Sequence, residues 1–216
     1  MIIKILSLDY RGIFFTILDR NRTKYNIILF NRIFRFICFL KGVKLGKRVI
    51  FNGNPRIRRH YNSTIHFGNE CRFNSSLNSI ILGLYQPCSF ITFRPESEIT
   101  FGNNCGASGL TIAAVTKITI GNNVLIGANT TIADTDFHHQ DLQKRKQDII
   151  PARPVKIEDN VFIGFHCFIL KGVTIGKNSV IGANSVVITD IPENSIAMGN
   201  PCKVILRRNR IEPPDS

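Results

Sequence analysis

Residues 157–187 read IEDNVFIGFHCFILKGVTIGKNSVIGANSVV, and an aliphatic side chain returns at every sixth position of this stretch. A period of six matches neither the 3.6 residues of a helical turn nor the two-residue repeat of a simple strand. Each hexad is therefore predicted to be one short strand followed by a corner. The aliphatic anchors are Ile157, Ile163, Ile169, Ile175, Ile181 and Val187, preceded in the same frame by Ile120, Ile126 and Ile132.

The residue three positions after each anchor supports a corner at that place. Asparagine, glycine and histidine tolerate left-handed backbone dihedrals, which a recurring turn requires. Because the corner already accounts for His166, we interpret this histidine as structural and not catalytic. The corner column consists of Asn123, Asn129, Asn160, His166, Gly172, Asn178 and Asn184.

Three faces of six residues close one coil, and stacked coils pair their strands in parallel around the column of anchors. The frame continues more faintly upstream, in FGNECR at 67–72 and FGNNCG at 101–106. The predicted fold is all-β: a parallel β-helix with the form of a triangular prism.

At IGNNVL, IGANTT, IEDNVF, IGKNSV and IGANSV the chain resembles the hexapeptide-repeat acyltransferase family, over roughly residues 60–206. The resemblance implies that the coil is left-handed and that the protein is a homotrimer. We expect an N-terminal basic and apolar helical segment at 1–59, the left-handed β-helix at 60–206 with an extruded loop at 134–153, and a C-terminal tail at 207–216.

The charge of the chain is concentrated in its N-terminal appendage. The formal net charge is +13, and residues 1–60 hold 14 Lys and Arg against only Asp9 and Asp19. Residues 26–48, NIILFNRIFRFICFLKGVKLGKR, alternate bulky apolar side chains with basic ones. Two interpretations stay open: a helix packed on its own domain, or an amphipathic basic helix in peripheral contact with an anionic membrane face. A nucleic-acid partner is not expected, because no recognition motif accompanies the charge.

Composition also bears on location. The six cysteines show no C-x-x-C pair and no metal-ligand spacing, so we expect reduced thiols and no requirement for a metal. Asp9 and Arg11 interrupt the first apolar stretch, which argues against a secretory signal peptide. The chain also lacks a run of about 18 uncharged apolar residues that would span a membrane. A cytoplasmic protein is predicted, peripheral to the inner membrane face if the appendage binds lipid.

The hexad count is broken at DTDFHHQDLQKRKQDIIPAR, residues 134–153, which must leave the prism as a loop. Long loops on a rigid scaffold are where catalytic groups tend to lie. This loop resembles that of the sugar O-acetyltransferases of the maltose, galactoside and polysaccharide type, in which a histidine stands at the start of such an excursion. His138 matches that histidine, and the adjacent His139 is the alternative. A solvated histidine pair without a catalytic role is the other interpretation.

The resemblance implies that His138 is a general base. A sugar hydroxyl is a poor nucleophile until its proton is removed, and imidazole titrates near neutrality. The hydroxyl would then attack the thioester of acetyl-CoA directly. Asp136 or Asp134 would fix the tautomer of the ring and stabilise the imidazolium. Asp134 is also a candidate contact of the substrate.

The family further implies that acetyl-CoA lies in a groove between neighbouring subunits. Small residues along the groove would let the pantetheine arm approach the backbone. The residues expected there are Gly164, Phe165, Gly182 and Ala183. The family's GNPCKVI ending, present at 199–205, places Lys203 near the adenine and the 3′-phosphate.

Two more positions follow from the same comparison of motifs. Thr189 precedes DIPEN where relatives carry a lysine before DIPPN, and it is expected among the cofactor contacts. Ser108, in GASGLTIAA at 106–114, matches a substrate-contacting position of the sugar transferases.

Together these residues predict an acetyl-CoA-dependent O-acetyltransferase that modifies a sugar hydroxyl, with a lipid-linked glycan of surface polysaccharide biosynthesis as the expected acceptor. N-acetylation of an amino sugar stays open. A non-catalytic structural or binding trimer also stays open, although a purely structural prism has no use for a long loop out of register. A zinc carbonic anhydrase built on the same prism is disfavoured, because its His-x4-His pair is absent from the sequence.

Overall fold

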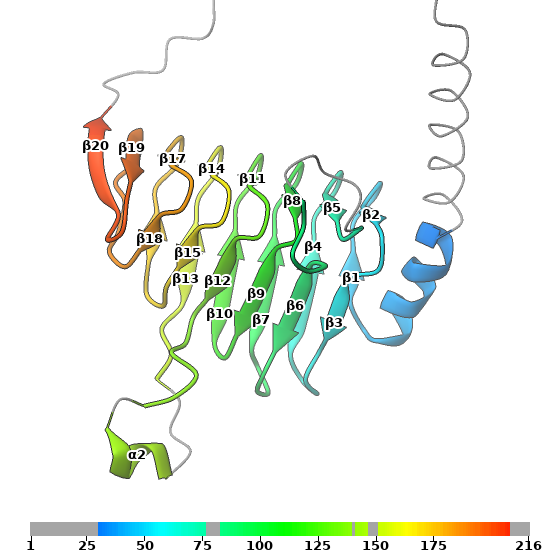
Figure 1. Ribbon diagram of the computed structural model, residues 1–216. Helices are drawn as coiled ribbons and strands as arrows, with labels where there is room; N and C mark the ends of the chain where they lie inside the picture. The colour runs from blue at the N-terminus through cyan, green and yellow to red at the C-terminus, as the bar shows by residue number, and fades with distance from the viewer. Residues whose placement is uncertain (1–29, 77–82, 140, 147–150, 208–216) are drawn as a thin grey trace, which may run out of the picture.

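The structure is a computed structural model that describes residues 30–76, 83–139, 141–146 and 151–207. Its short strands form three sheets, which the chain visits in turn (Figure 1). Sheet A contains β1 (Lys44–Leu45), β4 (Thr64–Phe67), β7 (Glu98–Phe101), β10 (Lys117–Ile120), β13 (Val155–Ile157) and β16 (Thr174–Ile175). Sheet B contains β2 (Ile50–Asn52), β5 (Arg72–Asn74), β8 (Gly106–Ser108), β11 (Leu125–Ile126), β14 (Phe162–Ile163), β17 (Val180–Ile181), β19 (Ser195–Met198) and β20 (Lys203–Arg207). Sheet C contains β3 (Arg56–Arg58), β6 (Ser89–Thr92), β9 (Thr111–Ala114), β12 (Thr131–Ala133), β15 (Phe168–Ile169) and β18 (Val186–Val187).

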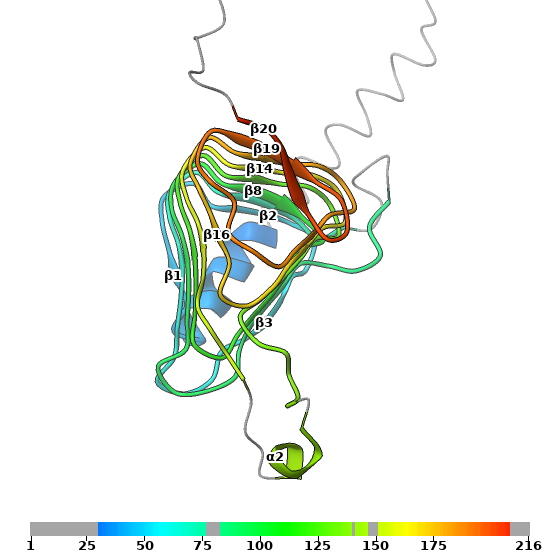
Figure 2. The ribbon, with the colours of Figure 1, turned by 90° about the vertical axis from the view of Figure 1, so that its left-hand side faces the viewer.

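Seen along its axis, the molecule is a triangular prism with one sheet on each side (Figure 2). Each coil lies directly on the next, so the anchors pair in register: Ile120 of β10 with Ile157 of β13, and Ile157 with Ile175 of β16. All strand pairs are parallel except the last, in which β20 runs antiparallel to β19. This is a left-handed parallel β-helix, as the period of six predicts.

The three edges of the prism are named after the sheets that they join. The A–B corner includes residues 121–124, 158–161 and 176–179; the B–C corner includes 127–130, 164–167 and 182–185; the C–A corner includes 115–116, 134, 170–173 and 188–190.

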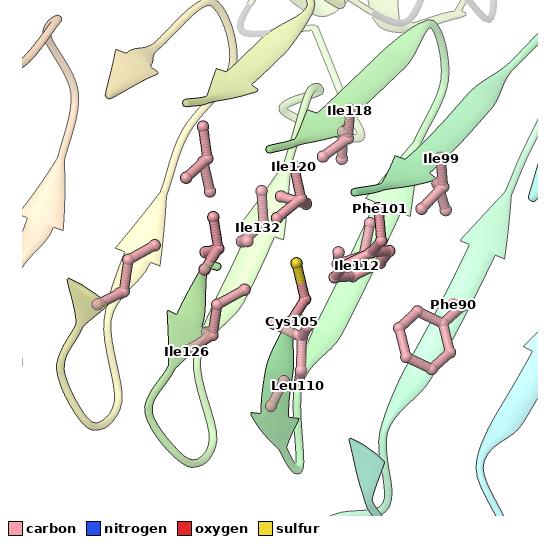
Figure 3. Packing of buried hydrophobic residues seen from close by; sticks show 14 of the residues in the cluster. Phe90, Ile99, Phe101, Cys105, Leu110, Ile112, Ile118, Ile120, Ile126 and Ile132 are labelled. Carbon is pink, nitrogen blue, oxygen red and sulfur yellow. The ribbon is translucent and has the colours of Figure 1, made fainter. Parts of the chain in front are cut away.

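The aliphatic anchors fill the interior of the prism. Each of the nine anchors is at most 2% exposed. Figure 3 shows several of them, with Ile120, Ile126 and Ile132 labelled, pointing inward from successive strands. Outward-facing neighbours such as Leu125 and Phe162 remain exposed. The predicted interior column is therefore confirmed.

The corner column is confirmed as well. Its asparagines have φ between +55° and +60°, His166 has +54° and Gly172 has +77°. At the A–B corner the asparagine side chains form a ladder from coil to coil, in which each Nδ2 donates to the next Oδ1 over 2.9–3.0 Å. Its members are Asn104, Asn123, Asn160, Asn178 and Asn194. Asparagine thus serves twice, because it accepts the left-handed backbone and also bonds to the neighbouring coil.

The coils begin earlier than the sequence suggests. Strands β1, β2 and β3 all precede residue 60, where the sequence places the start of the prism. The interior of these first coils is filled by aromatic rings, which a count of aliphatic anchors passes over. The buried rings are Phe51, Phe67, Phe73, Phe90 and Phe101.

A helix at residues 30–40 lies across the N-terminal end of the prism (Figures 1 and 2). Phe34 and Cys38 are buried on its inner side, and the ring centroid of Phe34 is 4.9 Å from that of Phe51. Asn31 pairs with the edge strand β2: its Nδ2 donates to the carbonyl of Phe51 and its Oδ1 accepts from the amide of Phe51, both at 2.7 Å. The helix therefore closes the open end of the core. No helix in the described ranges is long and apolar enough to cross a bilayer.

The interior column makes a prediction about stability. Replacing Ile157 by alanine removes a fully buried side chain and should lower the free energy of unfolding by about 2–5 kcal/mol. Lys156→Ala, at the outward-facing neighbour on the same strand, should cost no more than about 1 kcal/mol, because it removes only a surface ion pair with Glu158. Urea denaturation of both variants measures the difference, and equal losses would contradict the inward placement of the anchors.

Candidate active site

The loop that breaks the hexad count leaves the prism at the C–A corner, directly after β12 (Figure 2). Its two ends are held together. Thr135 forms an antiparallel bridge with Ala152, and the Thr135 hydroxyl donates to the carbonyl of Pro151 at 3.0 Å. Further out lies the short helix α2 (Leu142–Lys146), whose first amide groups are capped by the carboxylate of Asp141. The neck of the loop thus belongs to the rigid prism.

Asp134 is fully buried at the base of this loop. One carboxylate oxygen accepts from the amide of Val115 at 2.7 Å, and the other accepts from the amide and the hydroxyl of Thr116 at 2.6 Å and 2.7 Å. These bonds fix the C–A corner of the preceding coil. The sequence suggests Asp134 as a substrate contact or as a partner of the histidine, but the contacts that it makes here are those of a structural residue.

Asp136 ties the start of the loop to the next coil. Its carboxylate forms a half-buried ion pair with Lys171, which lies at the C–A corner after β15. Its carbonyl accepts from the amide of His138 at 2.7 Å. The expected contact between the Asp136 carboxylate and the imidazole is not among the hydrogen bonds of the described residues. Asp136 therefore positions the backbone of His138, and among the described contacts it forms no hydrogen bond with the His138 ring.

The turn before His138 is also anchored from the other side. Phe137 has a φ of +62°, and its amide donates to the Thr135 hydroxyl at 3.0 Å. Its ring meets that of Phe93, which follows β6 two coils away, with 5.8 Å between the centroids. Contacts to coils on both sides thus define where His138 emerges.

The two adjacent histidines differ in their surroundings. The ring of His139 is half-buried and its Nδ1 accepts from the amide of Asp141 at 3.0 Å, while its carbonyl accepts from Nε of Arg145 at 3.0 Å. His138 is exposed, and its imidazole has no hydrogen-bond partner among the residues that the structure describes. Of the two histidines, His138 is therefore the one whose ring is exposed and free of hydrogen bonds within the described residues.

The residues expected to hold acetyl-CoA lie at the B–C corner. Gly164 and Phe165 follow β14, and Gly182 and Ala183 follow β17 on the next coil. The coils are so close that a Cβ on Gly164 would lie 2.5 Å from the amide nitrogen of Ala183. Glycine is thus required at 164 by coil stacking alone.

The other two expected cofactor contacts lie at different places. The turn before Lys203 stacks on sheet C, because the amide of Cys202 donates to the carbonyl of Val186 at 2.9 Å. Lys203 therefore extends from the coil next to Ala183. Thr189 is exposed at the C–A corner, on the same edge of the prism as the loop with His138.

The expected base and the expected cofactor groove are consequently not brought together within one chain. His138 lies beyond one edge of sheet C and the pair Gly164 and Ala183 lies at the other edge. The outer surface of sheet C, with Thr131 and Phe168, separates them.

The six cysteines and five histidines all lie among the described residues. No three His, Cys, Asp or Glu side chains among them are grouped closely enough to hold a metal ion. All six cysteines are free and buried. Burial raises the pKa of Cys38 to about 11 and also raises the pKa of Cys167, so these thiols are protonated near neutral pH.

Comparison with known proteins agrees with this architecture. The model of the hexapeptide repeat of succinyl-transferase matches residues 117–133 and 154–189. The solved structure of a maltose O-acetyltransferase from Clostridium difficile 630 is 35% identical, with a TM-score of 0.53, over 77% of this chain and 70% of that one. The chain belongs to the hexapeptide-repeat acetyltransferase family.

Within this family the chain is close to the galactoside and maltose enzymes. It is 45% identical to the galactoside O-acetyltransferase of Escherichia coli (strain K12) over 122 residues, which are 55% of this chain and 59% of that protein. A solved galactoside acetyltransferase in complex with coenzyme A is 31% identical over 76% of this chain and 64% of that one, with a TM-score of 0.51. The matched part of the chain covers only 52–59% of the length of three curated relatives, among them this Escherichia coli enzyme.

The hexapeptide-repeat match stops at residue 133 and resumes at 154, so the loop interrupts the matched repeat. A second excursion, between β5 and β6, was missed by sequence reasoning. It brings Tyr85 to the B–C corner, where the Tyr85 amide donates to Oδ1 of Asn129 at 3.0 Å. The Tyr85 ring is 73% exposed and lies 6.4 Å from the ring of Phe165 and 6.1 Å from that of His166. The signal that could have found it is a second loss of the hexad frame, after Asn74.

Ser108 lies at the same corner, at the end of β8. Its hydroxyl accepts from Nδ2 of Asn74 at 3.0 Å, and the residue is half-buried. His166, interpreted as structural, does occupy a corner, and its Nδ1 lies 3.2 Å from Oδ1 of Asn184. The B–C corner thus carries a group of polar and aromatic side chains that line one edge of sheet C.

The contacts of Asp134 can be tested by its removal. Asp134→Ala leaves the amides of Val115 and Thr116 without their acceptors, and the free energy of unfolding should fall by about 2–4 kcal/mol, since each unsatisfied buried group costs about 1–3 kcal/mol. Asp141→Ala, which removes an exposed cap of α2, is the matched control and should cost no more than about 1 kcal/mol. Chemical denaturation measures both. A variant at Asp134 with unchanged stability and a raised KM would instead show a substrate contact.

Proposed function

We propose that this chain transfers an acetyl group from acetyl-CoA to a sugar hydroxyl, with His138 as the general base. The observation that carries the proposal is the exposed imidazole of His138 on a loop whose start is fixed by contacts to neighbouring coils. A positioned base on a rigid scaffold is what general base catalysis requires. The similarity to the galactoside and maltose O-acetyltransferases supports the choice of donor and of acceptor class.

The chemistry follows from the neutral imidazole. One ring nitrogen of His138 accepts the proton of the sugar hydroxyl while the hydroxyl oxygen attacks the carbonyl carbon of the thioester. The tetrahedral intermediate then collapses, the carbon–sulfur bond breaks, and the sulfur of coenzyme A takes the proton from the imidazolium. Asp136, bound to Lys171, positions the loop and is expected to act on the reaction only through the placement of His138.

Acetyl-CoA is proposed to lie along the B–C corner. The backbone near Gly164, Gly182 and Ala183 would border its pantetheine arm, and Phe165 would contact the arm from the same corner. Lys203 extends from the adjacent coil and would bind a phosphate through its ammonium group.

The separation of the two corners supports a site shared between subunits. A cyclic trimer in which the C–A corner of one subunit faces the B–C corner of the next would bring His138 and Thr189 against the neighbour's groove. Each site would then take its base from one chain and its cofactor contacts from another. Homotrimers of the kind implied by the family meet this requirement with three equivalent sites.

The acceptor is proposed to bind between Ser108 and the aromatic surface of Tyr85. Sugar rings present apolar faces that pack on aromatic side chains and hydroxyl groups that bond to serine and asparagine. We place the reaction in the cytoplasm, on a lipid-linked glycan destined for surface polysaccharide. Mass spectrometry of the acetylated product distinguishes an ester on a hydroxyl from an amide on an amino sugar.

The base is tested by substitution. His138→Ala should lower kcat by roughly 10²–10⁴, the usual contribution of a positioned general base, with little change in acetyl-CoA affinity. His139→Ala is the matched control and should lose much less, because that ring is engaged by the amide of Asp141. Thioester loss with sugar acceptors gives kcat, and calorimetry gives the affinity. Full activity in both variants would rule out this loop as the source of the base and would favour a non-catalytic prism.

The shared site is tested by mixing two inactive chains. Ala183→Trp, at an exposed position of the groove, should block acetyl-CoA, and His138→Ala removes the base. Co-expressed in equal amounts, the two variants should recover activity in about one quarter of the sites, because every mixed cyclic trimer contains one boundary with both halves intact. Activity no greater than the sum of the separate variants would show that base and groove come from the same chain.

A further inference from the structure

The helix at residues 30–40 has two apolar faces with different surroundings. Its inner face packs on the first coil through Phe34 and Cys38, which are buried. Its outer face consists of side chains at i, i+3, i+4 and i+7 spacing, and these are 37–67% exposed. They are Ile33, Phe36, Ile37 and Leu40. Phe39 is 75% exposed beside them. Closing the prism therefore requires only one of the two faces.

Basic side chains surround this exposed face. Residues 30–60 contain nine Lys and Arg and no Asp or Glu. Those in the first coil lie on strands β1 and β3 and on the turn after β1, at the same end of the prism as the helix (Figure 1). The exposed ones are Arg32, Lys41, Lys44, Lys47, Arg48, Arg56 and Arg58. The first acidic residue after the helix is Glu70, which pairs with Arg48.

We propose that this end of the prism docks on an anionic lipid surface, with the helix lying in the plane of the interface. A lipid bilayer offers an apolar layer for Phe36 and Leu40 directly beneath negative headgroups for the lysines, which matches the two kinds of side chain found together here. The described part of this helix, residues 30–40, is about 16 Å long, and no helix in the described ranges is long and apolar enough to cross a bilayer.

Other occupants fit the same surface less well. A second copy placed end to end would bring two uniformly basic surfaces together, and like charges at close range repel. A nucleic acid would satisfy the basic side chains but would leave the exposed aromatic and aliphatic side chains in water. Only a partner that is both apolar and anionic satisfies the whole surface.

The docked orientation deepens the proposed function, because it would hold the transferase beside lipid-linked acceptors. With the N-terminal end on the membrane, the sheets stand upright and the loop with His138 projects sideways from a corner, clear of the lipid (Figure 1). The catalytic groups are not part of the docking surface. Membrane binding and acetyl transfer to a sugar in solution can therefore be measured independently.

The test is partitioning of the full chain onto vesicles, followed by sedimentation. The wild type should bind vesicles of phosphatidylcholine with one quarter phosphatidylserine and should bind pure phosphatidylcholine much more weakly. Raising the salt from about 0.1 M to 0.5 M should weaken the binding, because it screens the lysines from the headgroups. No partitioning onto the anionic vesicles would overturn the proposal, whatever the acetyl transfer activity.

Two variants separate the apolar and the basic contributions. The triple change F36S/F39S/L40S should lower partitioning by at least roughly 100-fold, since it removes most of the apolar area that enters the interface. K44Q/K47Q should weaken it by roughly 25-fold, at about fivefold for each basic residue near an anionic surface. L125S changes an exposed apolar side chain on sheet B, away from the helix, and should bind as the wild type does.

The outcome also separates the rival occupants. Sedimentation velocity of the wild type and of F36S/F39S/L40S should give the same oligomer, and a change in mass would show that the face is covered by a second copy. All three variants should keep acetyl transfer to a sugar in solution. If either the triple variant or K44Q/K47Q binds the anionic vesicles as strongly as the wild type does, the docking surface is contradicted. If the wild-type protein shows no acetyl transfer, only the proposed function is affected.

Discussion

The whole molecule depends on the parallel pairing of each short strand with the strands of the coils before and after it. A strand of two or three residues contributes few hydrogen bonds, so it is stable only when both neighbours hold it in register. Each coil must therefore return the chain to the same three sides after the same number of residues. This requirement explains why inward-facing anchors such as Ile157 and Ile163 recur at fixed spacing. It also explains why residues with left-handed backbone, such as Asn160, recur at the corners.

The same constraint decides where function can be placed. Extra residues cannot be inserted within a strand without shifting all later anchors, so they leave the prism at corners. Among the described coils this happens at two places, between β5 and β6 at the B–C corner and between β12 and β13 at the C–A corner. The first excursion brings Tyr85 beside His166, and the second presents His138. Sheet C lies between these corners, which is why the proposed site combines the loop of one subunit with the groove of the next.

The open end of a β-helix presents a second problem, since its first strands have backbone groups without a partner coil. Here a helix covers the aromatic core, and the side-chain amide of Asn31 takes the place of the missing strand against Phe51. A cap needs only one apolar face. The additional apolar face of this helix, set among basic side chains, is what points to a lipid partner at this end of the molecule.

How much of this could be predicted depends on the range of the interactions involved. The anchors, the corners and the position of the loop were all predicted, because they follow from a period and from backbone preferences that act within a few residues. His138 was singled out because its loop resembles that of the sugar O-acetyltransferases, and its role as the base stays a prediction. The start of the prism was misplaced, since Phe51 and Phe73 fill the first coils where aliphatic anchors were sought.

Only the tertiary structure decided which residues of different coils are in contact. Asp134 looks like a catalytic carboxylate in the sequence, yet coil stacking buries it against Val115 and Thr116. Tyr85 shows no signal of its own and reaches the B–C corner through a bond to Asn129, far along the chain. The physical reason is that a period of six reports whether a side chain points inward or outward within its own coil. It carries no information on which residue of another coil lies opposite, above all where an excursion of irregular length intervenes.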